Sequence, residues 1–249
     1  MDEFCDPNIS QCFDPKDTQY LPAPDVYEKE YIYWPWGKLI KIAVQWLSSN
    51  APHSAFILDY MCGTGWLLNE LSLLRSDLIV EGCSLTRPFV EYARKKYPHI
   101  KVVMQDAMNY QPPMPPDIIV CSAGLHHLER TLQQKFIDKV ASELSQDKYF
   151  LLGEELINDF KSERERQLAV LEMVSALLLY VVKNDAPRDV AEAAANLVIN
   201  DLFEKGEYKT CYREIIEMLE PSFFIDSVHH TWPDDQSHFG DFLFICRRK

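Results

Sequence analysis

The chain has 249 residues, of which 47% are hydrophobic and 25% charged, and its formal net charge is −13. This composition excludes a disordered chain, because it supplies enough apolar surface for a core without disulfide or metal support. The acidic balance also disfavours nucleic acid as a partner, since a nucleic-acid surface needs a basic face that neutralises phosphates.

The cysteine count and the N-terminal sequence bear on the cellular location of the protein. There are seven cysteines and no C-x-x-C pair, and an odd number suits reduced thiols better than a disulfide framework. Residues 1–7 are acidic and lack the basic start and apolar stretch of a signal peptide. The longest apolar tract, 168–182, is interrupted by Glu172 and is too short to span a bilayer. We expect a cytoplasmic protein with no membrane partner and no bound metal.

The predicted elements begin with a polar, proline-punctuated lead-in or lid over residues 1–24. An aromatic run precedes the first expected helix, whose apolar positions recur at helical spacing from Trp36 until Pro52. Short apolar strands then alternate with amphipathic helices. Strands are expected at 55–60, 78–81, 100–104, 117–121 and 149–152, and helices at 66–74, 87–97 and 132–144. This alternation predicts a parallel sheet covered on both faces.

After Glu155 the pattern changes to helices alone. Helices are expected at 160–182, 188–203 and 209–219, and final strands at 223–228 and 241–246. The tract 168–182 is apolar nearly all round, as buried helices are. The predicted fold class is therefore α/β: a doubly wound, mostly parallel seven-stranded sheet with an antiparallel terminal strand and a helical insertion, or cap, after strand 5.

The most informative segment, residues 57–68, contains a carboxylate at a strand end, a tight glycine loop and a helix start. Gly63 and Gly65 let the backbone adopt positive φ angles and approach a ligand closely. The helix start offers free N–H groups to an anionic group. A dinucleotide-binding loop needs a third glycine and an acidic residue about 20 residues later. Here the acidic residue, Asp59, precedes the loop, which favours a ligand with an ammonium group and disfavours a dinucleotide oxidoreductase.

This segment resembles the first motif of the class I S-adenosylmethionine-dependent methyltransferases, commonly D-x-G-x-G-x-G. Asp59, Gly63 and Gly65 match it, and Met61 stands where the first glycine usually does. Three later segments resemble the family at suitable spacings, so the resemblance covers roughly residues 35–155. It implies S-adenosylmethionine as cofactor and ten cofactor-binding residues. These are Tyr31, Asp59, Met61, Gly63, Gly65, Ser84, Leu85, Asp106, Ala107 and Ser122.

The family's usual contacts explain several of these assignments. Ser84 takes the place of an acidic residue that usually grips the ribose hydroxyls, and Glu81 reaches that place only through a register shift. Asp106 and Ala107 correspond to the segment that recognises adenine. The aromatic run containing Tyr31 either folds over the cofactor or seals the first helix against the sheet.

Methyl transfer from a sulfonium is an in-line displacement, so the acceptor atom must be close and aligned, and an acceptor that carries a proton needs a base. The catalytic candidates are His126, His127 and Glu154, because they follow strands 4 and 5. Adjacent residues on a turn point differently, so we expect only one histidine to face the acceptor. Structural roles stay open for all three, since a helix-start histidine caps local backbone and a carboxylate there is favoured by the helix dipole.

The resemblance implies an enzyme that methylates oxygen, nitrogen or carbon of a small-molecule acceptor. The alternative is a non-catalytic S-adenosylmethionine-binding subunit that supports a partner protein, because Met61 and Ser84 depart from the family pattern. We divide the chain into a lead-in (1–34), a Rossmann-like cofactor-binding core (35–159), a helical insertion (160–208) and a last helix with the terminal strand pair (209–249). The insertion either roofs an acceptor pocket or forms a homodimer interface.

Overall fold

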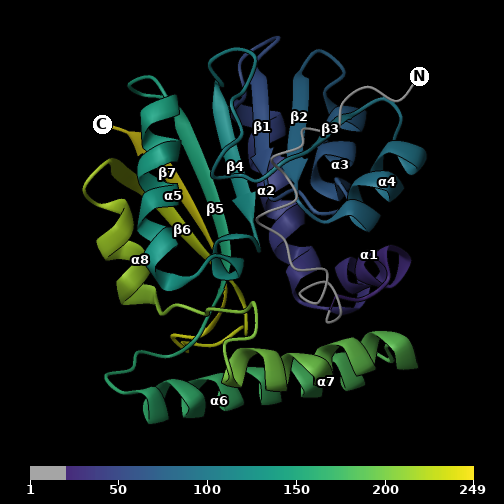
Figure 1. The fold of residues 1–249 in the computed structure, drawn as a ribbon, viewed down its shortest axis with the longest axis vertical. Helices are drawn as coiled ribbons and strands as arrows, with labels where there is room; N and C mark the ends of the chain where they lie inside the picture. Colours follow the sequence, from purple (N-terminus) through teal and green to yellow (C-terminus); the bar gives the residue numbers. More distant parts are fainter. Residues whose placement is uncertain (1–20) are drawn as a thin grey trace.

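The structure is a computed structural model and describes residues 21–249 (Figure 1). Seven strands form one sheet in the order β3-β2-β1-β4-β5-β7-β6. They are β1 (Phe56–Tyr60), β2 (Ile79–Ser84), β3 (Lys101–Met104), β4 (Ile118–Ser122), β5 (Tyr149–Leu156), β6 (Phe223–Trp232) and β7 (Gly240–Arg248). Strands β1 to β5 pair in parallel, whereas β7 runs antiparallel to both β5 and β6. The predicted fold class is confirmed.

Helices cover both faces of the sheet, as near-continuous apolar strands require. They are α1 (Pro24–Tyr33), α2 (Trp36–Asn50), α3 (Trp66–Leu74), α4 (Arg87–Lys96), α5 (Arg130–Glu143), α6 (Glu163–Lys183), α7 (Arg188–Leu202) and α8 (Tyr212–Leu219). One hydrophobic cluster joins α2, α3 and α4 to one face of the sheet, and a second joins α5 and α8 to the other. Alternate residues of β1 serve the two clusters: Ile57 faces the first and Leu58 the second.

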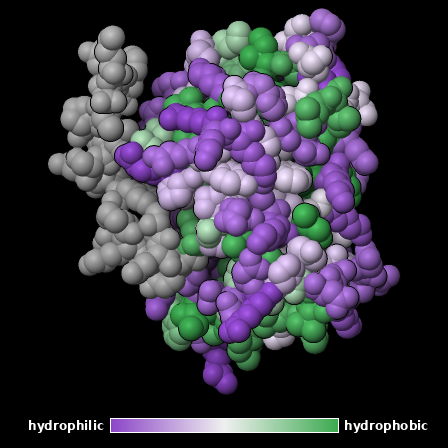
Figure 2. Space-filling view, turned by 90° about the vertical axis from the view of Figure 1, so that its right-hand side faces the viewer, coloured by the Kyte–Doolittle hydropathy of each residue, from purple (hydrophilic) through white to green (hydrophobic). Residues whose placement is uncertain are grey.

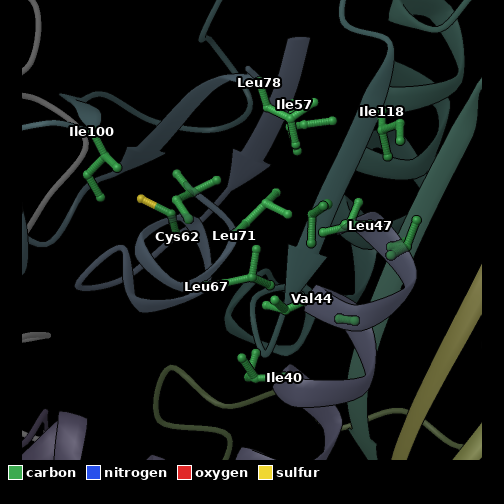
Figure 3. Packing of buried hydrophobic residues seen from close by; sticks show 14 of the residues in the cluster. Ile40, Val44, Leu47, Ile57, Cys62, Leu67, Leu71, Leu78, Ile100 and Ile118 are labelled. Carbon is green, nitrogen blue, oxygen red and sulfur yellow. The ribbon is translucent and has the colours of Figure 1, made fainter. Parts of the chain in front are cut away.

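Figure 3 shows how the first cluster supports the loop that follows β1. Side chains of α2 and α3 gather against Ile57 of β1 and Ile118 of β4, and Cys62 of the loop lies among them. Leu47 and Leu71 are fully buried in this cluster. The loop between β1 and α3 therefore rests on a packed layer that fixes its position.

The helix α1 is an element that the sequence analysis did not predict. It occupies the aromatic run, begins with Pro24 in its first turn, and ends at Tyr33, because Pro35 drives Trp34 into an extended conformation (ψ 156°). Of the predicted lead-in, residues 1–20 lie outside the described residues. A third hydrophobic cluster contains residues of α6 and α7, and Trp34 packs against it. Thus α1 connects the core with the insertion.

Two strands run further than their apolar patterns predict. Strand β2 continues to Ser84, and β5 continues to Leu156 because β7 pairs with it along its whole length. The expectation that Glu154 and Glu155 follow strand 5 was therefore wrong, because both lie within it. The register shift suggested for Glu81 is also wrong, since this residue lies inside β2 opposite Leu58.

The insertion helices α6 and α7 lie across the carboxyl ends of the parallel strands (Figure 1). Helix α6 was expected to be buried all round, but only one face is covered, which includes Val170 and Leu177. Leu168 and Leu179 on its other faces are 53% and 61% exposed. The surface in Figure 2 is mainly hydrophilic with scattered hydrophobic residues, and among the described residues no helix is both long and apolar enough to cross a membrane.

Candidate functional site

The glycine loop between β1 and α3 adopts the backbone geometry that its sequence predicts. Gly63 has φ +55° and Gly65 has φ +75°, both in the left-handed region. Met61 adopts φ +58°, so a methionine occupies a conformation that costs a residue with a side chain about 1–2 kcal/mol. The loop therefore keeps its shape without the first glycine of the family pattern.

Two buried polar side chains beside this loop lack partners. The Oδ1 atom of Asp59 and the Oγ1 atom of Thr64 are buried without a hydrogen-bond partner in the described structure. Burial raises the pKa of Asp59 well above its usual range. A ligand with donor groups supplies the partners that these atoms lack. The loop thus fits the ammonium-bearing end of S-adenosylmethionine.

Aromatic side chains of α1 cover the loop. The Tyr27 ring lies directly against Gly63, where a Cβ atom would be 3.2 Å from Tyr27 Cε1. Tyr31, the residue selected from the sequence, stacks on Trp66 at the start of α3 with ring centroids 5.2 Å apart. Helix α1 is also tied to α4, because Glu28 accepts hydrogen bonds from Tyr92 Oη of α4 at 3.1 Å and from Oη of Tyr97, the residue after α4, at 2.8 Å. Sequence reasoning selected Tyr31 from the aromatic run and not Tyr27, the side chain that lies against Gly63.

The remaining cofactor candidates lie where β2, β3 and β4 end. Ser84 ends β2, and its Oγ accepts a hydrogen bond from Thr86 N at 3.3 Å. The Asp106 carboxylate accepts from Met108 N at 2.9 Å, so it also holds its own turn. Leu85 is half-buried beside Ser84, Ala107 is buried beside Asp106, and Ser122 is the last residue of β4. The sheet order β3-β2-β1-β4 brings all of these to one edge.

His126 is fixed by a carboxylate from the neighbouring strand. Its Nδ1 atom lies 2.6 Å from Glu154 Oε2, and both side chains are buried. The other Glu154 oxygen, Oε1, accepts from Gly124 N at 3.1 Å and Leu125 N at 2.7 Å. Glu154 therefore holds both the turn after β4 and the orientation of the imidazole.

Both histidines approach the same carboxylate, Glu207, which comes from the end of the insertion. The turn Leu125–His127 is 3₁₀-helical, and its two histidine rings lie 4.4 Å apart. His126 Nε2 is 3.3 Å from Glu207 Oε2, and His127 Nδ1 is 3.4 Å from Glu207 Oε1. The tight turn and the returning chain thus bring both histidines to Glu207, while the expectation that only one of them faces the acceptor stays a prediction.

His127 and Glu207 shift each other's pKa values. Burial alone would lower the pKa of His127, but the Glu207 carboxylate more than offsets this, and the pKa is raised. Burial alone would raise the pKa of Glu207, yet His127, His126 and Lys209 hold it below its usual range. This part of the site is strongly polar although it is largely enclosed.

The polar region extends around Lys209 into what we call the acidic cluster. Its six carboxylates are all buried: Glu30, Glu154, Glu155, Asp201, Glu207 and Asp241. Lys209 Nζ donates to Glu155 Oε2 at 2.7 Å and lies 3.8 Å from Glu207 Oε2. Burial raises the pKa of Asp201 to about 8 despite Lys209, and it raises that of Asp241 well above its usual range. The acidic cluster thus holds more buried carboxylates than cations.

Backbone contacts explain why Glu207 and Lys209 lie here. Tyr208 N donates to His126 O at 2.6 Å, and Ile157 N donates to Thr210 O at 3.0 Å. These bonds fix the segment that returns from the insertion against the turn after β4 and the end of β5. Sequence reasoning missed both charged residues, since an irregular segment carries no periodic signal. The one feature of the sequence that could have indicated a functional role for Glu207 and Lys209 is the presence of two charged residues near the predicted end of the insertion.

Comparisons with known proteins agree with this arrangement. A model of the methyltransferase domain matches residues 57–147, which contain the glycine loop and the histidine turn. The comparison with curated protein sequences found no match. Among solved structures, magnesium protoporphyrin IX methyltransferase from Synechocystis, with bound S-adenosylhomocysteine, has a TM-score of 0.58 and 16% identity over 86% of this chain and 84% of its own.

Two further solved structures share the fold at similarly low identity. The N-methyltransferase NodS from Bradyrhizobium japonicum, in complex with S-adenosylhomocysteine, has a TM-score of 0.56 and 14% identity over 86% of this chain and 88% of its own. A TehB-like methyltransferase from Corynebacterium glutamicum has a TM-score of 0.54 and 16% identity over 83% and 86%. Residues 57–147 thus match a methyltransferase domain, and the chain shares the fold of solved S-adenosylmethionine-dependent methyltransferases. The structures with bound S-adenosylhomocysteine are consistent with S-adenosylmethionine as the cofactor.

Proposed function

We propose that the chain transfers the methyl group of S-adenosylmethionine to a small-molecule acceptor. The observation that carries the proposal is the position of two features at one sheet edge. The glycine loop follows β1, and the histidine turn follows β4, which pairs directly with β1. A cofactor on the loop would present its methyl group toward the enclosed polar region.

The bound cofactor supplies an electrophilic methyl group, and the chain supplies binding, orientation and exclusion of water. Asp59 and the loop would hold the methionine end, while Ser84 and Asp106 would contact the ribose and adenine. His126 and His127 would contact the acceptor, and Glu154 would act as a positioning residue because its oxygens already bind His126 and two backbone N–H groups. Coverage by α1 and the insertion supports a small acceptor over a macromolecule.

Thermal unfolding with S-adenosylmethionine, S-adenosylhomocysteine or NAD tests the cofactor half of the proposal. A ligand at about 100 times its dissociation constant adds about 2.7 kcal/mol to native stability. We expect stabilisation by both adenosyl compounds and none by NAD, and a weaker effect in Asp59→Asn. Incubation with labelled cofactor and a panel of hydroxylic, amine and carbon acceptors then tests transfer.

The two steps separate the alternatives. Binding without transfer to any acceptor would favour the non-catalytic subunit, for which Met61 in the glycine position is the supporting observation. No stabilisation by either adenosyl compound at millimolar concentration would contradict both readings. Stabilisation by NAD alone would contradict the assignment of the loop.

Two secondary expectations stay proposals. The exposed apolar side chains Leu168, Leu171 and Phe203 support a homodimer through the insertion, and sedimentation velocity of the chain and of Leu168→Glu tests it. The five buried cysteines in the described part of the chain are free thiols, which supports a cytoplasmic location. Fractionation of cells that express the chain tests the location.

A further inference from the structure

The enclosed side of the site contains a set of metal-binding atoms. His126, His127 and Glu207 each offer one ligand atom, and these three atoms all lie within 4.8 Å of one another. Imidazole and carboxylate together suit divalent transition metals. We propose that these residues bind one divalent transition-metal cation, with Zn²⁺ as the reference ion.

The distances between the ligand atoms fit such an ion. Zinc lies about 2.0–2.2 Å from nitrogen and oxygen ligands, so tetrahedral neighbours are about 3.3–3.6 Å apart. The nitrogens of His126 and His127 lie 3.3 Å and 3.4 Å from the two Glu207 oxygens. Each imidazole nitrogen therefore lies at the required separation from one oxygen of the Glu207 carboxylate, and one ligand atom from each residue lies within 4.8 Å of the others.

The surroundings of His126 prepare it as a ligand. A metal-binding histidine almost always donates its other ring N–H to a carboxylate or carbonyl, which fixes the tautomer and the ring orientation. Glu154 provides this acceptor at 2.6 Å from Nδ1, and Gly124 N and Leu125 N hold Glu154 in turn. The Nε2 lone pair then faces Glu207.

A buried carboxylate oxygen that accepts no hydrogen bond also points to a cation at this place, although His126 Nε2 lies 3.3 Å from it. Glu207 Oε2 is buried without a hydrogen-bond partner in the described structure, which is costly for a charged group. The closest ammonium, Lys209 Nζ, is 3.8 Å away and bonds Glu155 instead. A divalent ion between Glu207 and the histidines would supply the charge and the ligand bond that this oxygen lacks.

One of the three proposed ligands is partly exposed to solvent. The His127 side chain is 40% exposed, whereas His126 and Glu207 are buried. The Gly206 carbonyl oxygen lies 3.3 Å from His127 Nδ1 and is a further oxygen donor beside the site. Three protein ligands with an open position are typical of catalytic zinc, whereas structural zinc has four. The open position suits an oxygen or nitrogen of the acceptor.

Cobalt(II) binding tests the site without any methyl transfer. The full chain, stripped with EDTA, is titrated with Co²⁺ and followed by visible absorption, with Zn²⁺ competition and isothermal calorimetry. We expect one ion per chain, with the weak ligand-field bands of nitrogen and oxygen ligands and no thiolate charge-transfer band. The thiolate signature matters because five free cysteines are present in the described residues.

Matched variants decide which residues bind the ion. We expect His127→Ala and Glu207→Gln each to weaken Co²⁺ binding by about tenfold or more, and Glu154→Gln to weaken it about 10–100-fold. His99→Ala is the control, because His99 is an exposed histidine outside the proposed site, with its Nε2 atom 3.1 Å from Ser72 Oγ. Far-UV circular dichroism and the thermal shift with S-adenosylhomocysteine confirm that each variant is folded.

Several outcomes would overturn the proposal. They are the absence of stoichiometric binding, a thiolate spectrum, and equal affinity in His127→Ala, Glu207→Gln and the parent chain. In each case His126 has only a structural role between Glu154 and Glu207. Because the readout is the metal itself, these results leave the methyltransferase proposal untouched, and failure of cofactor binding leaves the metal site testable.

Discussion

Replacing Gly65 by alanine separates two reasons why a glycine is required in the loop. Gly65 has φ +75°, and a Cβ atom there would lie 2.8 Å from Ile100 Cδ1. Gly206 has the same φ of +75° but no heavy atom within 4 Å of its Cβ position. The two substitutions therefore share the backbone strain and differ in crowding.

The structure sets the size of each effect. Alanine in the left-handed region costs about 1–2 kcal/mol, which is the whole expected loss for Gly206→Ala. Crowding of a packed core adds about 1–3 kcal/mol, so Gly65→Ala should lose about 2–5 kcal/mol of unfolding free energy. Ile100→Val removes the methyl group that the new Cβ meets, and it should recover part of the additional loss.

Urea denaturation followed by circular dichroism measures these differences for six chains: the parent, the two alanine variants, Ile100→Val, and each alanine variant combined with Ile100→Val. The reasoning requires a coupling between positions 65 and 100 that is absent between 206 and 100. Equal losses for Gly65→Ala and Gly206→Ala, or no recovery in the variant that combines Gly65→Ala with Ile100→Val, would refute it. A loss of cofactor binding alone would not, since binding is a separate property of the loop.

Two further predictions concern charged side chains. Lys209→Met should destabilise the chain by about 3–5 kcal/mol, because it leaves Glu155 buried without its partner. Urea denaturation checks this, and Glu155→Gln in the same chain should restore part of the loss. The Asp117 carboxylate accepts hydrogen bonds from Lys148 Nζ and Phe56 N. Burial alone would raise the pKa of Asp117, but these two hydrogen bonds and the Lys148 charge hold the pKa below its usual value. Its stabilisation is therefore present above about pH 4 and is lost as pH falls through the folded pKa. Asp117→Asn should cost about 1–3 kcal/mol at pH 7 and progressively less below pH 4, in thermal unfolding between pH 3 and 7. A cost that stays constant with pH would contradict this account.

The sequence predicts the parts of the fold that depend on neighbouring residues. The glycine loop, helix α3 and the succession of strands and helices along the chain follow from local patterns, since glycine, proline and apolar spacing act within a few residues. Helix α3 was predicted at its observed bounds, Trp66–Leu74. The turn after β4 was also expected to contribute to the site.

The features that the sequence does not reveal depend on contacts between distant segments. Strand β5 continues through Glu154 and Glu155 because β7 pairs with it, although two glutamates in succession are poor strand formers. Glu207 lies beside the histidines because the chain returns to them after the insertion. Its neighbour Gly206, which contacts His127, is 79 residues further along the chain than His127. Helix α1 lacks an amphipathic pattern, and its placement depends on Trp34 and on contacts with α4 and α7.

The return of the insertion onto the turn after β4 also bears on how such a protein can diversify. Apart from Tyr31, the cofactor candidates come from residues 59–122, whereas Glu207 and Lys209 come from the far end of the insertion. Mutations that reshape α6, α7 and their return segment leave the register of β1 to β4 in place. The residues expected to bind the cofactor can therefore stay unchanged while substitutions in the insertion alter the acceptor side of the site. Residues 160–211 are accordingly a suitable target for directed evolution of acceptor choice.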